Sequence, residues 1–235
     1  MIVTVAGGKG GVGKTTVAFN LAAELDAVAV DADLGMADLP GGRGPDLHDV
    51  LAGRASPLEA VRRCGSVAVM PCGRTLAGTR VADPRRLVEA VRRIDEEYGA
   101  VVVDSPAGMA ADVGLALAVA DLCVLVATPE EPGVADALRT RALARELDAG
   151  LRAVALNRCG PDPPMESVRE VFGAPVVPIP ESDTLARAQR GSRPIRAVAP
   201  EGETAGRLEE LAESVRSWAR RDAWCSGNRD VTQGR

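Results

Sequence analysis

The sequence predicts an α/β fold with a mainly parallel, twisted sheet and helices on both faces. Apolar, β-branched stretches alternate with helical stretches from one end of the chain to the other. The strand-like stretches lack polar alternation, as expected of parallel strands that are covered on both sides. A length of 235 residues and a hydrophobic content of 46% fit one domain with a sizeable core.

The expected elements follow one another at short intervals. The first strand is IVTVA at 2–6, and a glycine turn leads from it to the helical stretch KTTVAFNLAAEL at 14–25. Later strands are expected at 27–31, 67–71, 100–104, 122–127, 152–157 and 175–179, with helices at 84–98 and 132–150. This alternation places a ligand crevice beyond the carboxyl ends of the strands. We assign residues 1–224 to a single domain and residues 225–235 to a polar, disordered tail.

Composition argues against several classes of protein. A net charge of -5 and a pI of about 5.1 argue against a surface that binds nucleic acid or anionic lipid over its whole extent. No stretch approaches the roughly 18 apolar residues that span a bilayer. The N-terminus MIVTVAGG lacks the basic region of a signal peptide, so we expect a cytoplasmic protein. The five cysteines form no CxxC pair, which fits reduced thiols rather than disulfides or a metal site.

The stretch GGKGGVGKTT at 7–16 carries the strongest chemical signal. It satisfies the phosphate-binding pattern G-x-x-x-x-G-K-[ST] between an apolar strand and a helix, which predicts a P-loop NTPase. Its backbone amides would form an anion nest at the helix N-terminus. Lys14 would reach the β- and γ-phosphates, and the Thr15 hydroxyl would bind a magnesium ion. A glycine-rich turn that binds nothing is the alternative. The predicted nucleotide-binding residues of this loop are Gly8, Lys9, Gly10, Gly11, Val12, Gly13, Lys14, Thr15 and Thr16.

Lys9 and Lys14 are the only lysines of a chain that has 26 arginines. Lys9 stands in the variable part of the loop, where the pattern does not require a lysine. With it, KGGVGKTT resembles the deviant Walker A motif of the MinD/ParA family of ATPases. The resemblance implies that Lys9 crosses the interface of a nucleotide-sandwich dimer and contacts the phosphates bound by the partner, a catalytic role shared with Lys14. A lysine that only attracts the nucleotide of its own subunit is the alternative.

Two acidic segments extend the resemblance. VAVDADLGMAD is similar to switch I of MinD-like ATPases, and VVVDSPAG is similar to their Walker B and switch II segment. The resemblance implies that Asp33 acts on the hydrolytic water and that Asp31 and Asp104 hold the magnesium shell. It also implies that the amide of Gly108 senses the γ-phosphate. Asp38 lies in the same loop as Asp33, but the sequence gives it no role, and a strand-end cap is the alternative for each acid.

The resemblance covers nearly the whole chain to about residue 200. ALNRC places Asn157 and Arg158 where the family carries a base-binding asparagine, and an asparagine amide can both donate to and accept from adenine. VPIPESDTLARAQRGSRPI resembles the family's late strand, loop and helix near the base, with Pro180 and Glu181 as candidates. DLHDVLAGRASPLEAV at 46–61 resembles the short helical segment after switch I.

These motifs together predict an enzyme that hydrolyses MgATP to ADP and phosphate, slowly without a partner. The resemblance implies a homodimer with ATP and a monomer with ADP, closest to the MinD branch, which positions division, polar or partition machinery with an activating or cargo protein. A ParA-type DNA-binding ATPase and a non-hydrolysing scaffold remain as alternatives. The candidate DNA-binding residues are Arg187, Arg190, Arg193 and Arg196, although a solvated helix face also explains them.

The stretch GRLEELAESVRSWARRDAW at 206–224 has apolar residues at helical spacing. They are Leu208, Leu211, Val215 and Trp218. Bacterial MinD ends in an amphipathic helix that binds membrane, but here four acids offset four arginines. The acids are Glu209, Glu210, Glu213 and Asp222. We expect this helix to pack on the domain, and peripheral attachment to the inner face of the membrane stays open.

Overall fold

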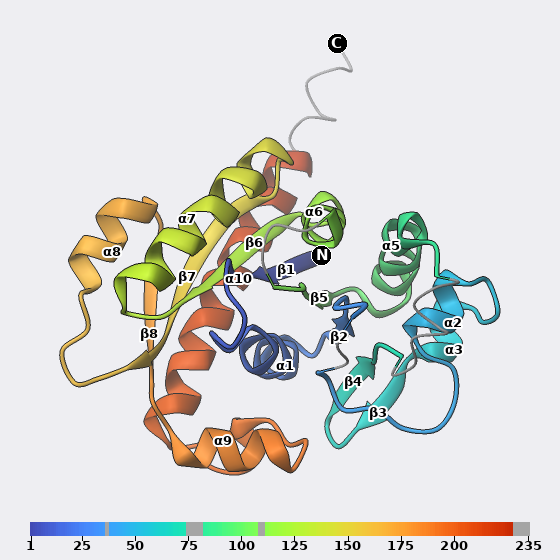
Figure 1. Cartoon of the computed structure of the whole chain (residues 1–235), viewed down its shortest axis with the longest axis horizontal. Coiled ribbons are helices and arrows are strands. Elements are labelled where there is room, and N and C mark those ends of the chain that lie inside the picture. Colours follow the sequence, from blue (N-terminus) through green and yellow to red (C-terminus); the bar gives the residue numbers. More distant parts are fainter. Residues whose placement is uncertain (36–37, 74–81, 108–110, 228–235) are drawn as a thin grey trace.

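The strands form one sheet in the computed structural model, which describes residues 1–35, 38–73, 82–107 and 111–227 (Figure 1). The strand order is β3-β4-β2-β5-β1-β6-β7-β8, and each neighbouring pair is parallel except β3 with β4. The predicted α/β fold class is therefore confirmed. The strands are β1 Ile2–Ala6, β2 Val28–Asp31, β3 Arg62–Cys64, β4 Val67–Met70, β5 Val101–Asp104, β6 Leu122–Ala127, β7 Gly150–Cys159 and β8 Val176–Pro180.

Helices cover both faces of the sheet, as alternate side chains of the central strand show. In β1, Val3 and Val5 join the apolar cluster that includes α1 and α10, whereas Ile2 joins the cluster of α2 and α5 on the other face. Figure 1 shows α5, α6 and α7 on one side of the sheet and α1 and α10 on the other. The helices are α1 Lys14–Leu25, α2 Leu47–Leu51, α3 Pro57–Ala60, η1 Pro84–Arg86, α5 Leu87–Tyr98, α6 Ala111–Ala118, α7 Glu131–Glu146, α8 Met165–Phe172, α9 Asp183–Arg190, η2 Ile195–Ala197 and α10 Glu203–Gly227.

The segment after β2 differs most from expectation. The helical stretch 46–61 is divided into α2 and α3, because Asp46 and Ser56 each form a capping box and each starts a separate helix. Gly53 between them has a φ of 72°, a conformation that breaks the helix. The short antiparallel strand β3 follows; its sequence RRC has no apolar pattern, so periodicity did not reveal it.

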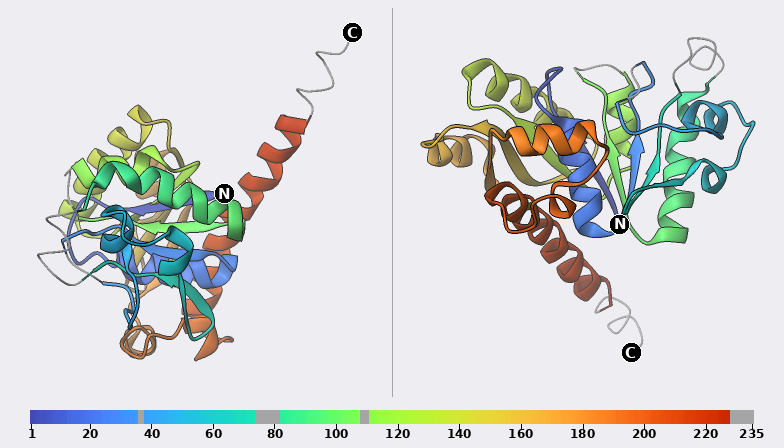
Figure 2. Two further views of the ribbon diagram at one scale, coloured as in Figure 1. Left: turned by 90° about the vertical axis from the view of Figure 1, so that its right-hand side faces the viewer. Right: turned by 90° about the horizontal axis from the view of Figure 1, so that it is seen from below.

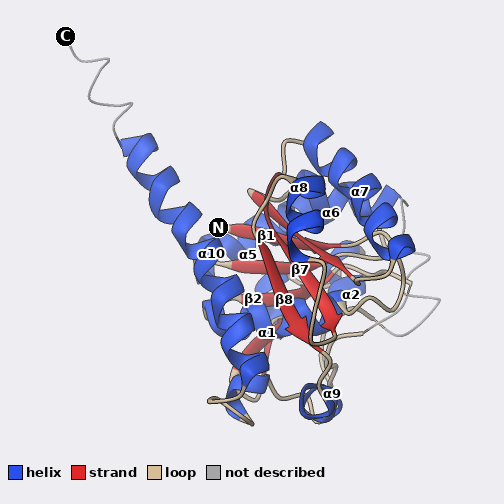
Figure 3. Cartoon of the chain, turned by 90° about the vertical axis from the view of Figure 1, so that its left-hand side faces the viewer, coloured by secondary structure: helices blue, strands red, loops and turns tan. Residues whose placement is uncertain are grey.

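The last helix packs on the domain, as predicted. Leu208, Leu211 and Val215 are buried, and Arg152 of β7 donates from Nε to the carbonyl of Ser214 over 2.6 Å. Helix α10 runs to Gly227, three residues beyond the expected end of the domain, and its last turns extend past the sheet and the other helices (Figures 2 and 3). No helix in the described part of the chain is both long enough and apolar enough to cross a membrane.

Candidate nucleotide-binding site

The predicted site residues gather where the central parallel strands end. The P-loop follows β1, and Asp31 and Asp104 end the adjacent strands β2 and β5 as register partners. Asn157 lies in β7, on the other side of β1 and β6. The parallel topology thus brings residues more than a hundred positions apart to one edge of the sheet.

The P-loop backbone is fixed by close contacts that only glycine permits. Gly11 and Gly13 have φ angles of 79° and 100°, which other residues rarely adopt. A Cβ on Gly8 would lie 2.2 Å from the carbonyl oxygen of Asp136 in α7, and a Cβ on Gly13 would lie 2.2 Å from Nδ2 of Asn157. The loop is therefore held between α7 and β7 in a conformation that requires glycine at these positions.

The two lysines lie in opposite environments. Lys14 is 7% exposed, and its Nζ donates to the backbone carbonyl of Lys9 over 3.2 Å. Burial lowers the pKa of Lys14, while the carboxylates of Asp104, Asp33 and Asp38 act to raise it. The residue Lys9 is exposed, and no hydrogen bond or ion pair of its side chain occurs among the described contacts. The fold thus buries the lysine that the P-loop pattern requires and exposes the additional one.

Asp31 holds the loop that follows β2. It is fully buried, its Oδ1 accepts from the amide of Asp33 over 3.3 Å, and its Oδ2 accepts from the amides of Asp38 and Leu39 over 2.9 and 3.0 Å. Burial raises the pKa of Asp31 to about 6 despite these three amides. The contacts give Asp31 a loop-holding role, and its predicted place in the magnesium shell stays a prediction.

Thr15 lies near two acids, Asp104 and Asp38. Burial raises the pKa of both carboxyls, and the Thr15 hydroxyl acts to lower it. Asp104 is 1% exposed, and its Oδ1 has no hydrogen-bond partner among the residues that the structure describes. Asp33 lies in the same loop as Asp38 and accepts from the amide of Gly35 over 3.1 Å. Asp38 is thus a site residue to which the sequence gave no role; its one signal was a third acid after the strand.

The donor set fits a hydrated magnesium ion. Magnesium prefers hard oxygen ligands, and the site offers the Thr15 hydroxyl and nearby carboxylates. Among the described residues, the buried Oδ1 of Asp104 has no hydrogen-bond donor. Among residues 1–35, 38–73, 82–107 and 111–227, no three His, Cys, Asp or Glu side chains form a metal-binding group by themselves. Thr15 and phosphate oxygens would then bind the ion directly, and the carboxylates would bind its water molecules.

The predicted base-binding residues lie near the ends of β7 and β8, and their contact with the base stays a prediction. Asn157 is 6% exposed, and its Nδ2 donates to the carbonyl of Val12 over 2.8 Å, so it braces the P-loop. Arg158 is exposed with a φ of 59°, at the register irregularity between β7 and β8. Pro180 ends β8 and is half-buried. Gly108 lies outside the described residues.

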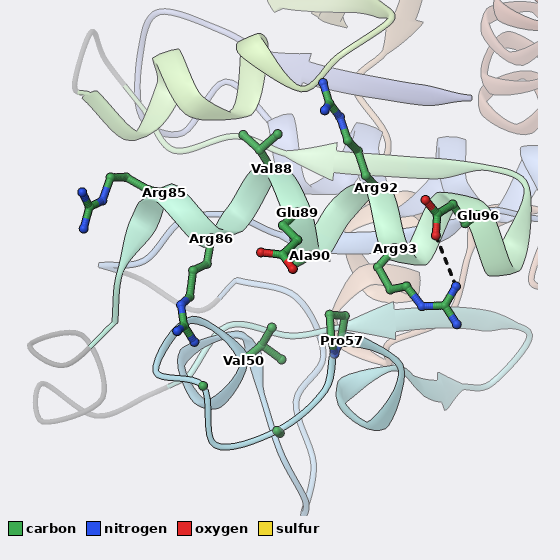
Figure 4. Close-up of a pocket in the computed structure, with 12 residues that line it drawn as sticks. Val50, Pro57, Arg85, Arg86, Val88, Glu89, Ala90, Arg92, Arg93 and Glu96 are labelled. Carbon is green, nitrogen blue, oxygen red and sulfur yellow. Dashed lines mark hydrogen bonds and ion pairs between the residues drawn. The ribbon is translucent and has the colours of Figure 1, made fainter.

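A cavity lies elsewhere, between α5 and the segment that carries α2 and α3. Its volume is about 760 Å³, and none of its lining residues belongs to the P-loop. Figure 4 shows Arg86 and Val50 on facing sides of it, with Arg93 paired to Glu96 at 3.3 Å. This cavity is therefore separate from the phosphate site.

Comparison with known proteins identifies the family. Residues 3–195 match the CobQ/CobB/MinD/ParA nucleotide binding domain. The chain belongs to this family.

Individual known proteins resemble the chain along most of its length. An uncharacterised ATP-binding protein of Methanocaldococcus jannaschii is 36% identical over an alignment of 173 residues, which covers 69% of this chain and 66% of that protein. The cell division ATPase MinD of Pyrococcus furiosus has a TM-score of 0.86 at 30% identity and covers 92% of this chain and 98% of its own. MinD of Pyrococcus horikoshii, solved with Mg-ADP, has the same TM-score and identity, with 93% and 96% coverage. The predicted MinD/ParA resemblance is thereby confirmed.

Proposed function

We propose that this protein is a MgATP-hydrolysing switch that dimerises when ATP is bound. The observation that carries the proposal is the contrast between the two lysines: Lys14 is buried in its own P-loop, while Lys9 is exposed on the same loop. An exposed cation at the phosphate site can neutralise charge on a nucleotide held by a second subunit, as an arginine finger does. Membership of the MinD/ParA family supports the same reading.

The chain's own residues supply the parts that phosphoryl transfer needs. The P-loop amides and Lys14 would hold the β- and γ-phosphates, and Thr15 and Asp104 would hold the magnesium ion. Asp33 would accept a hydrogen bond from the attacking water and orient it toward the γ-phosphorus, so that the bond to ADP breaks as the bond to water forms. Bound Mg²⁺ would supply charge stabilisation of the phosphate oxygens. MinD of P. horikoshii, solved with Mg-ADP, supports this choice of ligand.

Three variants separate the parts of the proposal. Lys9→Ala should abolish ATP-dependent dimerisation in multi-angle light scattering and leave ADP binding intact, because the described contacts include no hydrogen bond or ion pair of the Lys9 side chain and the substitution keeps the Lys9 carbonyl that accepts from Lys14. Lys14→Ala should weaken binding of both nucleotides, because it removes the buried cation. Asp33→Ala should keep the ATP dimer but lose phosphate release.

The same measurements can contradict the proposal. Equal rates of phosphate release for wild type and Asp33→Ala would identify a non-hydrolysing scaffold. A monomeric wild type at saturating ATP, or a Lys9→Ala variant that still dimerises, would mean that Lys9 serves its own subunit. Arg92→Ala is the matched control, because it removes an exposed cation of α5 that lines the cavity separate from the phosphate site.

The cellular role follows from family likeness. We propose spatial positioning of cellular machinery in the cytoplasm, with an activating or cargo protein, since the P. furiosus relative is a cell division ATPase. A fluorescent fusion should redistribute in Asp33→Ala cells, and an unchanged, uniform signal in both strains would argue against positioning. The DNA-binding alternative is weakened because Arg196 pairs with Asp26 at 3.1 Å and Arg193 donates to the carbonyl of Ala197 over 2.9 Å.

A further inference from the structure

The cavity between α5 and the α2–α3 segment has the size of a binding site but no part in the proposed reaction. Its volume of about 760 Å³ lies within the range of natural ligand sites. Val50 and Pro57 contribute apolar surface from the α2–α3 segment, and Val88 and Ala90 contribute it from α5. A ligand here would therefore lie between two elements and contact apolar side chains of both.

The charged residues of the cavity reverse the charge of the chain. The chain has a net charge of -5, but four arginines and two glutamates line the cavity: Arg85, Arg86, Arg92, Arg93, Glu89 and Glu96. Two of these arginines are already paired, because Arg85 lies 3.0 Å from Asp83 and Arg93 lies 3.3 Å from Glu96. Within the described part of the chain, Arg86, Arg92 and Glu89 form no ion pair. Two cations thus remain against one acid, which favours an anionic ligand.

Arg86 brings positive charge next to the apolar surface. It is exposed at the N-terminus of α5, and its side chain makes no capping hydrogen bond. Its guanidinium lies close to the turn between α2 and α3, where a Cβ on Gly53 would be 2.4 Å from Nη1. Figure 4 shows Arg86 directed from α5 toward the segment that carries Val50 and Pro57. The chemistry of the cavity therefore fits a peptide segment that has both carboxylates and apolar side chains.

Helix α2 connects the cavity with the loop that carries Asp33. Val50 lines the cavity, and His48 of the same five-residue helix has its Nε2 3.1 Å from the carbonyl oxygen of Leu34. Leu34 directly follows Asp33. So short a helix is not stable alone, and its position depends on the elements that pack against it. A ligand that contacts both α2 and α5 would hold α2, and through His48 the backbone beside Asp33.

We infer that this cavity binds an acidic segment of the activating protein, and that the bound segment raises the rate of ATP hydrolysis through α2. Carboxylates of the segment pair with Arg86, and its apolar side chains pack against Val50 and Pro57. The activating role rests on the proposed function, whereas binding of the segment does not.

Fluorescence anisotropy with a short labelled peptide of leucine and glutamate tests the binding. The same peptide with glutamine in place of glutamate is the uncharged counterpart. We expect Arg86→Glu to weaken binding of the acidic peptide about tenfold, the loss of one charge-assisted hydrogen bond, and Glu89→Gln to tighten it. A glutamate at a helix N-terminus is favourable, so Arg86→Glu keeps the fold. Arg190→Glu is the control, because it reverses the charge of an exposed arginine on α9 that does not line the cavity.

Four results would overturn the binding site. They are no binding of the acidic peptide to wild type, equal binding of the two peptides, wild-type affinity in Arg86→Glu, and an equal loss of affinity in Arg190→Glu. Light scattering tests a different occupant. If Arg86→Glu loses ATP-dependent dimerisation, a second copy of the chain occupies the cavity, and the inference is wrong.

Phosphate release from MgATP at saturating acidic peptide tests the route through α2. The peptide should raise the rate several-fold in wild type but not in His48→Ala, which removes the contact with Leu34 and leaves the cavity residues in place. His48→Gln keeps a polar side chain there and should recover part of the stimulation. An unchanged wild-type rate, or equal stimulation in His48→Ala, would overturn the activating role. A wild type that binds the peptide but releases no phosphate under any condition would instead overturn the proposed hydrolysis.

Discussion

The assignment of Asn157 to the P-loop makes a prediction that separates two roles. Its Nδ2 donates to the carbonyl of Val12 over 2.8 Å in a buried setting, so Asn157→Ala leaves that carbonyl without its donor. An unsatisfied buried acceptor costs about 1–3 kcal/mol. For a chain of this size each kcal/mol lowers the Tm by roughly 2–4 °C. We therefore expect a Tm several degrees lower and a looser P-loop.

Nucleotide selectivity is the assay that decides between the roles. If Asn157 acts by bracing the P-loop, Asn157→Ala should weaken ATP and GTP by the same factor, because both nucleotides place their phosphates in that loop. A loss confined to ATP, with GTP unaffected, would refute the bracing role and restore the adenine contact that the family resemblance implies. Asn20→Ala is the matched control: Asn20 is equally buried and bonds Thr16 and Ile195, so it should lower the Tm without changing relative affinities.

Two further predictions concern the same region. Gly13→Ala should destabilise the protein by about 1–3 kcal/mol, because Gly13 has a φ of 100° and its Cβ would overlap Asn157. Urea unfolding of Gly13→Ala, Asn157→Ala and the double variant should show a double variant that costs less than the sum, and strict additivity would contradict the overlap. The folded pKa of Asp31, about 6, is raised above its ordinary value of 3.8, so its contribution to stability is complete at low pH and is lost as pH rises. Urea unfolding should show wild type losing up to about 3 kcal/mol more than Asp31→Asn between about pH 4 and about pH 6, and parallel pH profiles would contradict this.

The sequence predicted the parts of the site that depend on strand order. The sequence shows directly where an apolar strand ends in an acid. In a parallel sheet the carboxyl ends of neighbouring strands lie at the same edge, and Asp31 and Asp104 do lie side by side there. The sequence does not show which residue a given side chain contacts in the fold. Asn157 has the residue type that suits adenine, but its contact with Val12, 145 positions away, depends on how closely β7 approaches the P-loop. Likewise, the letters do not show that the Asp38 amide donates to Oδ2 of Asp31, seven positions earlier.

Hydrogen bonds hold the backbone on both sides of Asp33, and they come from two residues that have no assigned contact with nucleotide. On one side Asp31 accepts from the amide of Asp33, and on the other Nε2 of His48 lies 3.1 Å from the carbonyl of Leu34. His48 belongs to α2 and also contacts Cys72 Sγ at 3.4 Å, so the second tie links the loop to the core rather than to the phosphate site. A water-orienting carboxylate needs a fixed backbone, because a displacement of one ångström can cost a large part of the rate. The two contacts therefore hold the backbone that carries Asp33, the carboxylate we predict to orient the attacking water.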